Sequence, residues 1–312
     1  MGMRRLNPFI IVSFLLFSFN FFYPEKVAAV SNEPGDYLAA EDWDIGTPTS
    51  GFPDCGGPSW HGWECKNYDC DHDYQSELST TIYYTPPRSY HQIRVQGQAD
   101  TVDLIYTLPS PQTKIHLRMY IYFGQSFQNA HAGSNEEIIH FVFFNTANSG
   151  VNFSVDIWNY TDQPYDSNNY CPSGGDNGGI HFGFHTYHDD CVGDCSSNET
   201  MKGPAGNQSP NCWNIKDHLE EWHCYEFMWD FNTHTAKWWI DGNLKMERTP
   251  ICACNHSSIN KIILSGWNSC TSCRNHYEAD FYIDNIVIDN KYIGPYVPSG
   301  APARPSNLRI KP

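Results

Sequence analysis

From residue 81 onward the sequence consists of short segments in which apolar and polar residues alternate, separated by clusters of Gly, Asn, Pro and Asp. A period of two is the pattern of a β-strand with one buried face, and closely spaced segments of this kind are typical of an all-β sandwich. Only KDHLEEWH (216–223) has a local helical pattern, and it is too short to set the fold class. We expect strands at 91–96, 101–106, 114–123, 137–144, 151–158, 180–187, 223–230, 235–240, 259–267 and 279–288.

The N-terminus has the features of a targeting segment. Arg4 and Arg5 precede the apolar run PFIIVSFLLFSFNFF, and small residues follow at 27–29. This is the order of regions in a secretory signal peptide. We therefore predict a signal peptide at 1–29, a secreted, extracellular protein and no membrane insertion after the signal is removed.

The rest of the chain divides by composition. Residues 30–80 form an irregular Cys/Gly/Pro-rich entry segment, residues 81–296 the β domain, and residues 297–312 a Pro-rich tail. One β sandwich can reach about 250 residues, so a second domain is not required. The segment 161–212 is long, rich in Gly, Asn and Asp, and holds four cysteines. We expect it to be a disulfide-rich loop insertion at the rim of the sandwich.

All twelve cysteines lie in the predicted mature chain, which agrees with disulfide formation in an oxidising compartment. Five Asn-x-Ser/Thr sites would carry glycans in a eukaryote and have no meaning in a bacterium. They are Asn152, Asn159, Asn198, Asn207 and Asn255.

The formal net charge is −16. A field of this sign repels nucleic acid and anionic lipid, so we expect neither as a partner. It also disfavours polyanionic glycans at long range unless the binding site is locally positive.

Two segments near the end resemble a known superfamily. WHCYEFMWDFNTHTAKWWIDGNLKM (222–246) is similar to the paired strands of concanavalin A-like lectins and glucanases, and FYIDNIVIDNKYIGP (281–295) resembles the closing strand of jelly-roll polysaccharide lyases. The resemblance implies a concanavalin A-like jelly roll of two antiparallel sheets. Because this fold hosts lectins, hydrolases and lyases, function has to be argued from the site.

The strand 114–123 has an unusual polar side. Alternation places Lys114, His116, Arg118, Tyr120 and Tyr122 on one face and only apolar residues on the other. The same reading of other strands adds polar and aromatic residues. They are Gln92, Arg94, His140, Asp156, Trp158, His185, Lys237 and Trp239. If these strands share one sheet, the side chains form a concave wall that could bind sugar rings by stacking and hydrogen bonds.

This inventory would serve β-elimination on a uronate. Arg118 or Arg94 could neutralise the carboxylate, His116 or His140 could take the C5 proton, and Tyr120 could protonate the leaving oxygen. The alternative for each residue is structural, because lysines and arginines on surface strands are commonly solvated and Trp158 or Trp239 could belong to the core.

Known enzyme signatures of the superfamily are incomplete here. The Glu-x-Asp-x-x-Glu strand of retaining glucanases is approached by 278–283, which lacks the final Glu. Gln92-Ile93-Arg94 departs from the Gln-Ile-His signature of alginate lyases, whose other signatures are absent. No cofactor is required for either chemistry. The resemblance does imply a structural calcium ion, for which Glu41, Asp44 and Asp284 are the candidate ligands.

Zinc is a second metal to consider. Cys252, Cys254, Cys270 and Cys273 offer four thiols at close spacing. In a secreted chain disulfides are favoured over zinc at such positions.

Three functions remain open from sequence. The first is a secreted protein that binds an extracellular polysaccharide and cleaves it as a lyase does. The second is a non-catalytic, lectin-like glycan-binding module, and the third, less favoured, is a glycoside hydrolase or a structural matrix protein.

Overall fold

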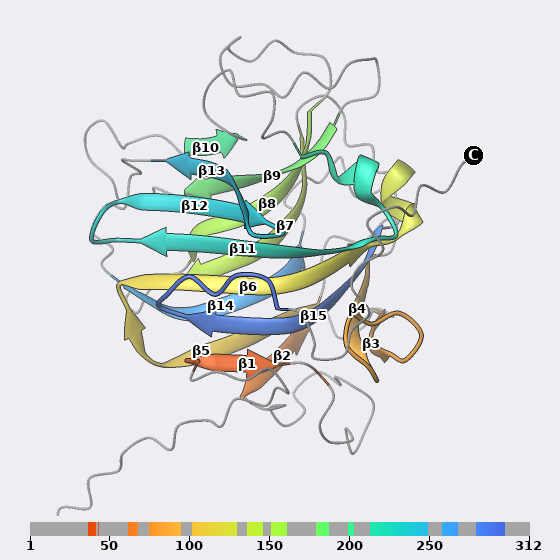
Figure 1. Ribbon diagram of the computed structural model, residues 1–312, viewed down its shortest axis with the longest axis horizontal. Coiled ribbons are helices and arrows are strands. Elements are labelled where there is room, and N and C mark those ends of the chain that lie inside the picture. Colours follow the sequence, from red (N-terminus) through yellow and green to blue (C-terminus); the bar gives the residue numbers. More distant parts are fainter. Residues whose placement is uncertain are drawn as a thin grey trace, which may run out of the picture.

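The computed structural model describes residues 37–41, 43, 62–67, 75–94, 102–129, 136–145, 151–160, 179–186, 199–202, 213–248, 258–267 and 279–296. In these ranges the chain forms two antiparallel sheets packed face to face, as Figure 1 shows. The predicted all-β jelly-roll sandwich is confirmed. The predicted signal peptide, the Pro-rich tail and every cysteine side chain except that of Cys224 lie outside the described residues.

Sheet A has eight strands. Along one path they run in the order β13 (Asn243–Arg248), β12 (Thr235–Ile240), β11 (Trp222–Asp230), β6 (Lys114–Phe123), β15 (Ala279–Asp289), β4 (Ser89–Arg94) and β3 (Gln75–Ser79). The short strand β1 (Ala39–Glu41) pairs with the second half of β15. The central strand β6 is thus flanked by β11 and β15, which follow it in sequence by about a hundred residues or more.

Sheet B has seven strands. Their order is β10 (Glu199–Lys202), β9 (Gly179–Thr186), β8 (Val151–Tyr160), β7 (Glu136–Asn145), β14 (Ile259–Trp267), β5 (Val102–Gln112) and β2 (Trp63–Asn67). In Figure 1 sheet A lies in front and sheet B behind it. Among the described residues, two short 3₁₀ helices, η1 (Gln125–Asn129) and η3 (Ile215–His218), lie in connections. Within the described part of the chain, no helix has the length and hydropathy needed to cross a membrane.

The core forms where the apolar faces of the two sheets meet. From β6 it takes Ile115, Leu117, Met119, Ile121 and Phe123, the apolar side of the alternating segment, and every one of them is fully buried. Full burial of an aliphatic or aromatic side chain contributes about 1.5–3 kcal/mol, so period-two alternation is sufficient to fix which side of β6 faces inward.

The hairpin between β12 and β13 follows the sequence signal. Asp241 and Gly242 both have positive φ, 48° and 78°, which is the backbone of a two-residue hairpin turn. Of the adjacent tryptophans, Trp238 packs in the core and Trp239 lies on the outer face, half-buried. Both features follow from the residues themselves, since Gly tolerates positive φ and successive residues of a strand point to opposite faces.

Several strands were not predicted. β1, β2 and β3 belong to the Cys/Gly/Pro-rich entry segment, yet they pair with the sheets. β10 lies in the predicted insertion 161–212, which also contains the whole of β9. The helix expected at 216–223 is the single 3₁₀ turn η3, because residues 222 and 223 already pair with β6 in β11.

Candidate functional site

The predicted polar wall does not exist as a single face. β6 and β12 belong to sheet A, whereas β7, β8 and β9 belong to sheet B. His140, Asp156, Trp158 and His185 therefore lie in a different sheet from His116, so the strands do not share one sheet and cannot form a single concave wall. Alternation shows which residues of one strand share a face but does not show which strands share a sheet.

Within sheet A, Gln92 faces away from His116. Its cross-strand partner is Phe281, a core residue, and Gln92 itself is 2% exposed. Arg94 pairs with Ala279 at the end of β4, and its side chain lies outside the described residues. His91, next to Gln92 in β4, lies on the outer face, where its ring stacks on Tyr282 with centroids 3.9 Å apart.

The polar residues of β6 do share the outer face of sheet A, but they are covered. His116, Arg118 and Tyr120 are at most 3% exposed. The cover consists of the 80–88 loop and the exit segment, residues 290–296, which follows β15. In Figure 1 the exit segment is the blue coil that crosses β6. A polysaccharide could reach these side chains only by displacing the chain's own segments.

Glu226 fastens the exit segment. Its carboxylate is 1% exposed and accepts the backbone N–H of Ile293 at 3.0 Å through Oε1 and that of Gly294 at 2.8 Å through Oε2. Oε1 also lies 2.7 Å from Nδ1 of His116. A buried carboxylate is stable only when its oxygens are paired, and this one is paired with an imidazole and two main-chain donors. His116 thus has a structural partner.

Tyr120 also holds the exit segment in place. Its hydroxyl and that of Tyr84 both donate to the carbonyl of Tyr296, at 2.5 and 3.0 Å. The rings of Tyr84 and Tyr120 stack with centroids 3.7 Å apart, and the guanidinium of Arg118 lies 5.5 Å from the Tyr120 ring. Burial raises the pKa of Tyr120 well above its ordinary value, so the phenol stays protonated.

Trp239, the predicted sugar platform, already has an aromatic neighbour. Tyr292 of the exit segment lies against it, with ring centroids 5.2 Å apart, and also contacts His116 edge-on. Lys237 pairs with Glu247 at 2.9 Å, and both side chains are partly exposed. Lys237 is therefore a solvated surface lysine, which the sequence analysis gave as the alternative to a sugar-binding role.

Cys224 lies on the same covered face and forms no disulfide. Its thiol is buried, and burial raises its pKa to about 12, so it is neutral and unreactive at ordinary pH. Because the other cysteines number eleven, they cannot all pair within one chain.

The candidate calcium ligands have other partners where they are described. Asp284 accepts the N–H groups of Tyr84, Thr85 and Asn285 at 2.7–2.9 Å. Glu41 pairs with Ile286, a core residue, whereas Asp284 pairs with Tyr120 on the outer face. Asp44 lies outside the described residues. A calcium ion at these three residues stays a prediction.

In sheet B, one row of cross-strand partners contains an aromatic residue, a histidine, an acidic residue and a lysine. Trp267 of β14 pairs with His140 of β7, and His140 pairs with Asp156 of β8. Asp156 pairs with Gly183 of β9, which pairs with Lys202 of β10. In the neighbouring rows Trp158 pairs with His181, and Ser154 pairs with His185. We call the five residues of the first row the sheet B row.

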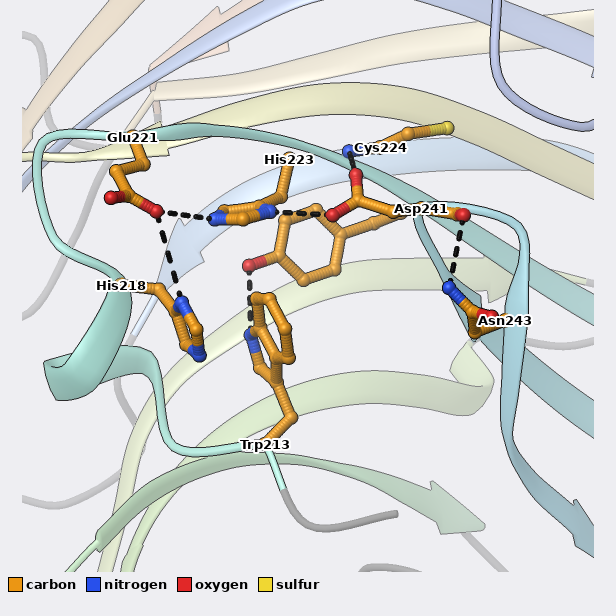
Figure 2. A network of polar contacts seen from close by, with 8 residues as sticks. Trp213, His218, Glu221, His223, Cys224, Asp241 and Asn243 are labelled. Atoms are coloured by element: carbon orange, nitrogen blue, oxygen red, sulfur yellow. Dashed lines mark hydrogen bonds and ion pairs between the residues drawn. The ribbon is translucent and has the colours of Figure 1, made fainter. Parts of the chain in front are cut away.

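A third group, the rim cluster, lies at one end of β11. It consists of Trp213, His218, Glu221, His223 and Asp241, drawn in Figure 2. Glu221 Oε2 is 3.2 Å from His223 Nε2 and 3.9 Å from His218 Nδ1. The other nitrogen of His223, Nδ1, is 2.7 Å from Asp241 Oδ2.

The local fold positions each member of the rim cluster. Asp241 sits in the β12–β13 turn, where its Oδ1 accepts the N–H of Cys224 at 3.0 Å. The ring of His218 stacks on Trp213 with centroids 3.7 Å apart and planes at 4°. Burial, and then the charge of His223, lowers the pKa of His218. The sequence prediction missed this cluster, although the His-x-x-Glu-x-His spacing in KDHLEEWH was a signal that could have found it.

No protein-family model matches the chain, and no curated protein matches it. Among solved structures it is similar to cellulose induced protein Cip1, with 15% identity over 75% of this chain and 94% of that one and a TM-score of 0.46. Alginate lyase Aly36B is 12% identical over 75% and 88% of the two chains, with a TM-score of 0.46.

A further similar structure is an endo-beta-1,4-glucuronan lyase from the fungus Trichoderma reesei. It is 8% identical over 71% of this chain and 89% of that one, with a TM-score of 0.45. All three TM-scores lie below 0.5. The fold assignment therefore rests on the strand order and register of this chain itself.

Proposed function

We propose that this protein is a secreted glycan-binding protein that holds an extracellular polysaccharide across strands β14, β7, β8 and β9 of sheet B. The observation that supports this most is the sheet B row, in which Trp267, His140, Asp156, Gly183 and Lys202 follow one another as register partners on five strands. Aromatic rings with a few polar groups are the usual composition of sugar sites.

The glycine in the row fits this proposal. Gly183 follows Asp156 in register and has no side chain. A glycine inside a strand often marks a place where a ligand approaches the backbone closely. In the neighbouring rows Trp158 is the register partner of His181, and Ser154, whose side chain is fully buried, is the register partner of His185.

The outer face of sheet A is the weaker candidate, although its residues were the first to suggest sugar chemistry. Glu226 and Tyr120 are engaged by the exit segment, and Tyr292 occupies the space against Trp239. A ligand there would have to break several hydrogen bonds made by buried groups, each of which costs about 1–3 kcal/mol when left unmade.

Cleavage by β-elimination is the second candidate, favoured by the cross-strand register of His140 with Asp156 and by the place of Lys202 in the same row. His140 would take the C5 proton, the C4–O bond would break as the C4=C5 double bond forms, and the resulting imidazolium would return the proton to the leaving oxygen, while Lys202 would neutralise the uronate carboxylate. This assignment replaces His116, Arg118 and Tyr120 as the catalytic set. The net charge of −16 makes a neutral or weakly charged glycan the better first ligand to test.

The test is retention on an array of neutral and uronate polysaccharides. We expect the mature protein to bind, and Trp267→Ala and Asp156→Asn each to weaken binding at least about tenfold, because each removes a central contact. The matched control is Trp239→Ala, because Trp239 lies in sheet A against Tyr292. This variant should bind as the wild type does.

A tenfold loss of binding in Trp239→Ala, with unchanged binding in Trp267→Ala, would place the binding site on sheet A. No retention on any glycan would reject the proposed function. For cleavage, the appearance of unsaturated uronyl absorbance that disappears in His140→Ala would establish a lyase.

A further inference from the structure

We infer that the rim cluster is a binding site for a divalent transition-metal ion of the zinc class, with His218 Nδ1, Glu221 Oε2 and His223 Nε2 as its protein ligands. These three atoms all lie within 4.8 Å of one another. They come from η3, from the short connection after it and from the first residues of β11, as Figure 2 shows.

The spacing of the ligand atoms suits a metal. Bonds of about 2.0–2.2 Å to nitrogen and oxygen place neighbouring tetrahedral ligands roughly 3.4 Å apart. Here Glu221 Oε2 is 3.2 Å from His223 Nε2 and 3.9 Å from His218 Nδ1. All three atoms lie within 4.8 Å of one another, and movement of the Glu221 and His218 side chains, 59% and 31% exposed, would bring them to bonding distance of one ion.

A carboxylate already orients one of the two histidines. Asp241 holds Nδ1 of His223 at 2.7 Å, which directs Nε2 toward Glu221. This is the carboxylate–histidine arrangement that orients histidine ligands in metal sites. Asp241 is itself fixed by the N–H of Cys224 and by its place in the hairpin turn.

The second imidazole is also oriented. His218 stacks on Trp213, and the indole N–H of Trp213 donates to the hydroxyl of Tyr225, a buried residue, at 3.2 Å. Both ligand rings are therefore held by groups that do not bind the metal. Such preorganisation reduces the entropy lost when an ion binds.

The donor set selects the class of ion. Two imidazoles and one carboxylate suit zinc, cobalt, nickel, copper or iron, whereas calcium and magnesium prefer oxygen ligands alone. Glu221 and Asp241 also bring two carboxylates together, and a dication would balance them. With His223 6% exposed, His218 31% and Glu221 59%, the site opens to solvent on one side, which leaves a fourth position for water or a ligand oxygen.

The experiment is a titration of the mature protein, stripped of metal by a chelator, with Zn²⁺ followed by calorimetry and with Co²⁺ followed by visible absorption. We expect one equivalent to bind, and the Co²⁺ spectrum to lack the thiolate charge-transfer band that cysteine ligands would give. Glu221→Gln and His218→Ala should each weaken binding at least about tenfold, and Asp241→Asn about 10–100-fold.

Glu221 and His218 are partly exposed, so these variants should keep the fold, which near-ultraviolet circular dichroism can verify. Glu220→Gln is the matched control, because this exposed neighbour lies in the same turn but outside the cluster, and it should bind as the wild type does. Absence of binding, or unchanged affinity in folded Glu221→Gln and His218→Ala, would overturn the inference.

Discussion

Replacing Glu226 by alanine should lower the free energy of unfolding by about 3–5 kcal/mol, the cost of removing one partner from a buried charged network. The substitution leaves His116 Nδ1 and the N–H groups of Ile293 and Gly294 without their acceptor in a buried place. It also unfastens the exit segment. Chemical denaturation measures the loss, and faster tryptic cleavage after the exposed Lys291 would report release of the segment.

The matched control for Glu226→Ala is Lys237→Ala. Lys237 pairs with Glu247 on the same sheet, but both side chains are partly exposed. Ion pairs in such surroundings contribute about 0–1 kcal/mol, so this variant should be close to the wild type. If Glu226→Ala were equally mild, the exit segment would not be held by the contacts described.

Asp284→Ala should cost about 3 kcal/mol, at roughly 1 kcal/mol for each N–H group that loses a buried acceptor. Three such groups, from Tyr84, Thr85 and Asn285, donate to the carboxylate, which is fully buried. The 80–88 loop would lose its attachment to β15, and with it the stacking of Tyr84 on Tyr120. Denaturant unfolding measures the effect.

Comparison of Asp284→Ala with chelator-treated wild type shows whether this carboxylate accepts hydrogen bonds or binds calcium. If the carboxylate serves the N–H donors, a calcium-selective chelator should leave the wild-type melting temperature unchanged. A decrease in the presence of a calcium chelator, comparable with that of the substitution, would instead establish the calcium ion that the sequence resemblance implied.

The strands could be predicted from the sequence because the alternation of buried and exposed residues is a property of each strand by itself. β6, β12 and β14 have the predicted bounds, and the apolar side of β6 is the core side. These features depend on a period of two, which any half-buried strand must show. The short strands β1, β2 and β3 were missed, because their pairing is decided by distant partners and not by their own pattern.

The site was predicted less well, for a related reason. The same alternation that grouped His116, Arg118 and Tyr120 could not show that the exit segment covers them, since a polar outer face and a covered polar face have the same pattern. Nor could it place Asp156 in another sheet, because long-range pairing sets the strand order. The rim cluster combines η3, β11 and the β12–β13 turn, and no single segment contains its geometry.

The most direct test of the central claim is amide hydrogen exchange with and without the best-retained glycan. Binding across sheet B predicts slower exchange in 136–145, 151–160 and 179–186, the ranges of β7, β8 and β9. Exchange in 114–123 and 235–240, the ranges of β6 and β12, should be unchanged. Protection confined to β6, β12 and the exit segment would contradict the account and return the binding site to sheet A.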